Sequence, residues 1–88
     1  MKVYGWTGMR REAAGSDRWR NQTREIVAAK SKAEVGRIVG VDPRQLFNLV
    51  DTGNPREIAI AMAEPGVRFW KPLDDYRGEF RRDEGSGS

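Results

Sequence analysis

Residues 10–24 interleave arginines with one tryptophan, a combination that can bind phosphate groups. The residues are Arg10, Arg11, Arg18, Trp19, Arg20 and Arg24. Arginines can grip phosphates while an indole ring between them stacks on a base. Because the stretch has several turn-forming residues and no sustained period, it predicts a long loop over 8–22. The alternative is a solvated loop whose Trp19 packs back onto the core.

Residues 31–50 contain the start and stop signals of two short helices. Ser31 with Glu34 forms a capping box, and Gly40 is placed to end the first helix. Asp42 and Pro43 then suit the cap and first position of a second helix. Apolar residues recur at helical spacing: Val35, Ile38 and Val39, then Leu46, Leu49 and Val50. The stretch therefore predicts two helices joined by a tight turn.

This two-helix pattern resembles the helix-turn-helix of phage and bacterial DNA-binding proteins. Gly36 matches the small residue where the helices cross, Gly40 lies in the turn and Val41 follows it. The positions that would pack the helices together are Val35, Val39, Leu46 and Leu49. The alternative is an ordinary helical hairpin inside a small α+β domain.

The resemblance implies that the start of the second helix faces base edges. Arg44 would then pair with guanine, and Gln45 or Asn48 with adenine, each good pair discriminating by ~1–3 kcal/mol. Lys32 lies near a helix start where phosphates would pass, and Arg18, Arg20, Arg24 and Trp19 would add contacts from the arginine-rich loop.

Three residues depart from the usual motif. Pro43 and Phe47 stand where polar side chains are usual, and Asp42 would repel phosphate. Phe47 could contact a thymine methyl group, pack beneath another helix or form an exposed apolar spot for a protein partner. The last possibility makes Phe47 and Trp19 candidate partner-binding residues.

Composition excludes several kinds of chemistry. The 88 residues suffice for one small domain, and they include no cysteine and no histidine. Disulfides, thiolate metal sites, Ser-His triads and most zinc chemistry are therefore absent. The only carboxylate cluster, Asp74, Asp75 and Glu79, lies in a polar stretch typical of a solvated face. We expect no enzyme activity, no metal and no cofactor.

Charge is unevenly distributed along the chain. Residues 1–56 carry eleven Lys/Arg against six Asp/Glu, whereas residues 57–88 carry five against seven. Arginine outnumbers lysine twelve to four, which favours phosphate and interface contacts, although a solvated surface is equally compatible. No apolar run reaches the ~20 residues of a membrane span, and no signal peptide opens the chain. We therefore expect a cytoplasmic protein.

The remaining segments complete the predicted fold. Residues 2–7 and 67–71 favour strands, and residues 23–29 favour a strand with a helix as the alternative. Asn54 and Pro55 open a third helix. The prediction is an α+β domain over 1–73, a small mainly antiparallel three-stranded sheet on three short helices (β-β-α-α-α-β). A charged tail over 74–84 is either disordered or docked by Tyr76 and Phe80, and 85–88 is typical of an appended linker.

Beyond the two-helix segment, the chain looks similar to small proteins of bacteriophages that infect actinobacteria, mycobacteriophages among them. The similar segments are Val-Tyr-Gly-Trp-Thr-Gly (3–8), Gln-Thr-Arg-Glu-Ile-Val-Ala-Ala (22–29) and Phe-Trp-Lys-Pro-Leu-Asp-Asp (69–75). The resemblance implies expression in the infected bacterial cytoplasm.

Two functions remain open at this point. One is a small regulatory phage protein that binds double-stranded DNA. The other is a non-enzymatic interaction module for a host or phage protein. Either could act as a homodimer.

Overall fold

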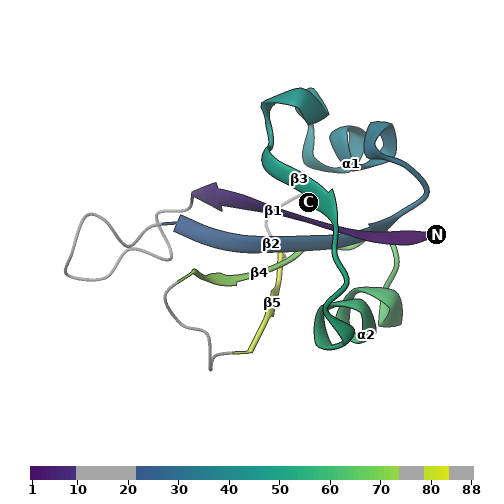
Figure 1. Ribbon diagram of the computed structural model, residues 1–88, viewed down its shortest axis with the longest axis vertical. Coiled ribbons are helices and arrows are strands. Elements are labelled where there is room, and N and C mark those ends of the chain that lie inside the picture. Colours follow the sequence, from purple (N-terminus) through teal and green to yellow (C-terminus); the bar gives the residue numbers. More distant parts are fainter. Residues whose placement is uncertain (10–21, 74–78, 84–88) are drawn as a thin grey trace.

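A five-stranded antiparallel sheet with one α-helix on each face makes up this computed structural model, which describes residues 1–9, 22–73 and 79–83. The strand order is β3-β1-β2-β4-β5. Helix α1 and a short 3-10 helix lie over one face, and α2 lies over the other (Figure 1). In chain order the elements are β1 (Lys2–Met9), β2 (Gln22–Ala29), α1 (Lys32–Val39), the 3-10 helix η3 (Pro43–Gln45), β3 (Phe47–Asp51), α2 (Pro55–Ala63), β4 (Phe69–Pro72) and β5 (Arg81–Arg82).

Strands β1 and β2 form the centre of the sheet. Their register pairs Tyr4 with Val27 and Trp6 with Glu25. Residues 26–29 are all fully buried because helices cover both faces, so they form a continuous apolar run instead of alternating with polar residues. A continuous apolar run is compatible with either a buried strand or a helix, so the sequence alone allowed both for residues 23–29. The strand is confirmed.

Two apolar clusters stabilise the fold, one on each face of the sheet. The α1 face holds Tyr4, Trp6, Val27, Ala29, Val35 and Leu49. The α2 face holds Val3, Ile26, Ala28, Ala61 and Phe69. Tyr4 and Trp6 therefore share one face of the sheet. The helices were expected on a single face, however, and that expectation is wrong.

The end signals of α1 act as predicted. The Ser31 hydroxyl accepts a hydrogen bond from the Glu34 amide at 3.2 Å, and Glu34 accepts one from the Lys30 amide. Gly40 adopts the left-handed conformation (φ 88°) that ends the helix.

The predicted second helix does not form. Asp42 does cap a helical turn by accepting a hydrogen bond from the Arg44 amide, but helical structure ends at Gln45, and Leu46 is already extended (φ −84°, ψ 118°). Residues from Phe47 onward pair with β1 instead. Local capping specifies only the first turn, whereas the backbone groups on the open side of β1 need a partner strand. Strand pairing therefore overrides the helical pattern.

The helix-turn-helix interpretation is therefore wrong. Gly36 does mark a close approach, but its neighbour is the turn: a β-carbon there would lie 2.6 Å from Pro43 Cδ and 2.8 Å from the Val41 carbonyl oxygen. Leu49 and Val50 do not share a buried face either, since Leu49 is buried and Val50 is 53% exposed.

The third predicted helix is confirmed as α2. The Asn54 side chain accepts hydrogen bonds from the amides of Arg56 and Glu57, and Pro55 takes the first position. In the part of the chain that the structure describes, no helix is long and apolar enough to cross a membrane.

The strand expected over 67–71 forms as β4, and β3 and β5 extend the sheet beyond the three strands expected. β4 pairs with β2, so Glu25 lies between Trp6 and Trp70 in the register of the sheet. Phe69 belongs to the cluster on the α2 face. The aromatic residues of β4 therefore do not lie on a strand next to that of Tyr4 and Trp6. Phe80 packs against the α2-face cluster, as the docking alternative for the tail predicts, and Tyr76 lies outside the described residues.

Candidate functional site: the groove between helix α1 and edge strand β3

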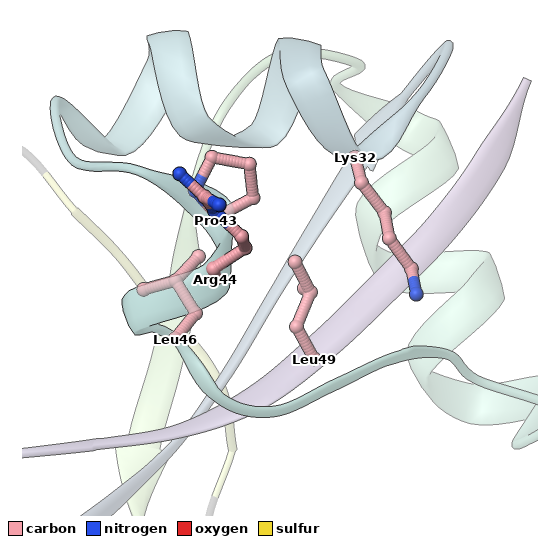
Figure 2. A pocket seen from close by; sticks show the side chains of 5 residues that line it. All are labelled: Lys32, Pro43, Arg44, Leu46 and Leu49. Atoms are coloured by element: carbon pink, nitrogen blue, oxygen red, sulfur yellow. The ribbon is translucent and has the colours of Figure 1, made fainter.

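A groove of about 350 Å³ lies between α1 and the segment that follows it (Figure 2). Its lining consists of Lys32, Pro43, Arg44, Leu46 and Leu49. In Figure 2, Lys32 extends from the start of α1 on one side, Pro43 and Arg44 lie on the other, and Leu49 lies between them. The groove thus has apolar lining residues and two basic side chains, and it lies beside an edge strand.

Strand β3 pairs only with β1, so among the described residues its other side has no partner strand. Between two pairings with β1, β3 advances three residues and β1 advances two. This bulge contains Asn48, which has a positive φ of 59°. A bulge bends an edge strand and limits its indiscriminate pairing with other chains. β3 is therefore an edge strand whose regular pairing geometry is interrupted by a bulge at Asn48.

The two faces of β3 differ. Leu49 points into the α1-face cluster and the groove. Phe47 and Val50 lie opposite Thr7 and Gly5, and these two apolar side chains are 66% and 53% exposed. Large apolar side chains exposed at an edge are typical of an interaction surface.

The electrostatics of the groove are basic with one local acid. Arg44 binds Asp42 through Nη2 at 2.8 Å and through Nε at 3.2 and 3.3 Å. The side-chain hydrogen bond from Arg44 and its backbone amide lower the pKa of Asp42, and Asp42 in turn raises the pKa of Arg44. The Arg44 side chain is still 90% exposed, so it remains accessible to a partner.

Most of the predicted binding residues lie on or beside this segment. Lys32 and Arg44 line the groove, and Gln45, Phe47 and Asn48 are exposed along η3 and β3. Apart from Lys32, which begins α1, these residues lie on a 3-10 turn and a bulged strand, not on one face of a helix. Of the arginine-rich stretch, Arg18, Trp19 and Arg20 lie outside the described residues.

Arg24 lies elsewhere and is already engaged. It belongs to β2 and donates to Glu57 of α2 from Nε and Nη2, each at 2.8 Å. Thr52 also donates to Glu57, at 2.6 Å. Arg24 therefore connects the sheet to α2.

A second charged cluster was not predicted from the sequence. Glu25 is 2% exposed and accepts hydrogen bonds from Thr23 and from Arg68, each at 2.7 Å. Arg68 also forms an ion pair with Asp83 at 3.4 Å and lies over the Trp6 ring. These groups are directed at one another and join β2 to residues flanking β4 and β5, so we assign the cluster a structural role. A glutamate directly before the apolar run of β2 is the one sequence signal for it.

The described ranges contain no group of three or more Cys, Asp or Glu side chains that could hold a metal ion. No protein-family model, curated protein or solved structure matches this chain. The groove and its edge strand are therefore the features of the chain that bear on function.

Proposed function

We propose that this chain is a non-enzymatic protein-interaction module that binds an extended segment of a partner protein along the open edge of β3. The observation that carries the proposal is the juxtaposition of that edge with the groove on one face and with exposed Phe47 and Val50 on the other. A partner of host or phage origin, in the infected bacterial cytoplasm, accords with the similarity to phage proteins.

Strand addition explains why these features occur together. An added strand gains affinity from main-chain hydrogen bonds and specificity from pockets that take alternate side chains. Side chains on one face of the added strand would enter the groove beside Leu49. Side chains on its other face would cover Phe47 and Val50, which are otherwise exposed to water.

The opposite edge of the sheet is less suited to this role. β5 has only two residues, Arg81 and Arg82, and both are exposed. Short, positively charged edge strands discourage pairing with another chain. The proposal therefore concerns β3 alone.

DNA binding has less structural support. Arg44, Gln45 and Asn48 were assigned to bases because a recognition helix would present them together, and that helix is replaced by η3 and β3. Nucleic-acid binding therefore enters the experiment as a competing outcome.

The experiment selects peptides from a random dodecapeptide display library against the full chain. Enriched peptides are then titrated by fluorescence anisotropy against the native protein and the Phe47→Lys and Val50→Lys variants. A lysine at either position should weaken binding by about tenfold, since it replaces an apolar contact at the edge. Met62→Lys is the matched control because Met62 is also exposed (43%) but lies on α2.

Two results would overturn the proposal. One is the absence of any peptide that binds in solution. The other is equal binding by all variants, which would place the contact elsewhere. Random-sequence duplex DNA is titrated in parallel, and DNA binding that survives physiological salt without peptide binding would favour the DNA-binding function.

A further inference from the structure

We infer that the partner segment is acidic as well as extended, with carboxylates on both sides of an aliphatic side chain that enters the groove. This inference rests on the proposed function and specifies the chemistry of the partner. It is carried by the charge and the apolar lining of the groove between α1 and β3.

The apolar part of the groove selects an aliphatic side chain. It is formed by Pro43, Leu46 and Leu49. A volume of about 350 Å³ is at the lower end of ~300–1,000 Å³ ligand pockets, so it suits one or two side chains rather than a folded element. An apolar lining penalises a buried polar group that finds no hydrogen-bond partner there.

The charges at the groove select carboxylates. Both charged side chains that line it, Lys32 and Arg44, are basic. The Lys32 side chain forms no ion pair or hydrogen bond within the described part of the chain. The two side chains come from different elements and lie on opposite sides of Leu49 in Figure 2. A partner with one carboxylate toward each side is therefore complementary to the groove.

The positions of the two basic side chains and the apolar lining predict a sequence pattern in the partner strand. Side chains of an added strand that face the groove are two residues apart. The expected pattern is acidic, aliphatic and acidic at positions i, i+2 and i+4. The intervening residues face the Phe47 side of β3.

Asp42 sets how strongly the Arg44 side attracts a carboxylate. It occupies Nε and Nη2 of Arg44 and so competes with the partner for the same guanidinium. Asp42 also caps η3 by accepting the Arg44 amide at 2.9 Å. The substitution Asp42→Asn would keep this cap but remove the charge, because asparagine caps a helix as well as aspartate does.

The test uses three fluorescein-labelled nonapeptides centred on Asp-Thr-Leu-Thr-Asp, Asn-Thr-Leu-Thr-Asn and Lys-Thr-Leu-Thr-Lys. Anisotropy titrations are made at low and physiological salt. The aspartate peptide should bind the native protein about three- to tenfold more tightly than the asparagine peptide at low salt, with a smaller ratio at higher salt. The lysine peptide should bind most weakly.

Variants then locate the preference. Lys32→Glu should abolish the advantage of the aspartate peptide, and it should still fold because an acid favours the first turn of a helix. Asp42→Asn should increase that advantage by about twofold. Arg56→Glu on α2 is the matched control, since it makes the same change in net charge and should leave the preference intact.

The outcomes separate this inference from the proposed function. Equal binding of the aspartate and asparagine peptides, still weakened by Phe47→Lys, overturns the acidic preference and leaves the module intact. Equal effects of Lys32→Glu and Arg56→Glu overturn it too, because net charge alone would then explain the preference. Failure of these peptides and of every display-selected peptide overturns both.

Discussion

Arg24 and Glu57 form a two-point ion pair that joins β2 to α2, with Nε and Nη2 of the arginine each 2.8 Å from a carboxylate oxygen. The guanidinium passes over Gly5, where a β-carbon would lie 2.6 Å from Arg24 Cζ. The side chains of Arg24 and Glu57 are only 24% and 9% exposed. The sheet and the helix are thus connected by a charge pair that is largely removed from solvent.

Removing one partner of this pair should destabilise the protein. Arg24→Met or Glu57→Gln should lower the free energy of unfolding by about 2–4 kcal/mol, because each leaves a buried charge without its partner. Urea denaturation measures the change. The matched control is Arg44→Met, which breaks the exposed Arg44–Asp42 pair and should leave the unfolding midpoint unchanged. Equal midpoint shifts for Arg24→Met and Arg44→Met would contradict the structure.

The same ion pair predicts how the stability of the protein decreases at low pH. Burial opposes ionisation of Glu57, but hydrogen bonds from Arg24 and Thr52 outweigh it, so the pKa of Glu57 is lowered on folding. A lowered pKa contributes stability above the unfolded value of ~4.3, and the contribution is lost as pH falls through the lower folded value. Thermal unfolding from pH 7 to pH 3 should therefore show a decline below pH ~4.5. The decline should be shallower in Glu57→Gln, and an identical slope would argue against this origin.

Gly36 should resist substitution although it lies within a helix. Alanine usually favours a helix over glycine by ~1 kcal/mol, but a β-carbon at Gly36 would overlap Pro43 and the Val41 carbonyl. Gly36→Ala should therefore lower the unfolding free energy by about 1–3 kcal/mol. Gly53→Ala is the control because nothing lies within 4 Å of a β-carbon there, and it should not destabilise. Stabilisation by Gly36→Ala would show that α1 does not pack on the turn in this way.

Two substitutions in β3 test which of its side chains are buried. Leu49 is 9% exposed and belongs to the α1-face cluster, so Leu49→Ala should cost about 2–4 kcal/mol. Phe47→Ala should change the unfolding free energy by no more than ~0.5 kcal/mol, since Phe47 is 66% exposed. Both are read from urea denaturation. A large loss with Phe47→Ala would favour a different register of β3.

The local signals in the sequence were interpreted correctly where each acts within a few residues. Ser31, Gly40, Asp42 and Asn54 each have the conformation or hydrogen bonds that their cap positions predict. The prediction is wrong from Leu46 onward. The helical start at Pro43 is real, but the predicted helix continued into residues that form β3. A local capping signal contains no information about β1, whose backbone groups pair with those of β3.

The candidate site was only partly predictable for the same reason. Lys32, Arg44 and Phe47 were predicted as binding residues from local patterns, but the groove that Lys32 and Arg44 line depends on how β3 returns beside β1. The Arg24–Glu57 pair spans 33 residues, and no pattern along the chain connects them. Arg24 was therefore assigned to a phosphate-binding loop although it lies within β2.

Peptide binding along β3 can be observed by NMR, through nuclear Overhauser contacts of the full chain with a bound display-selected peptide. We expect new cross-strand contacts between peptide backbone protons and residues 47–51, together with amide shifts at Lys32 and Leu46. Contacts confined to α2 or β5, or a peptide that binds without any contact to β3, would contradict this expectation.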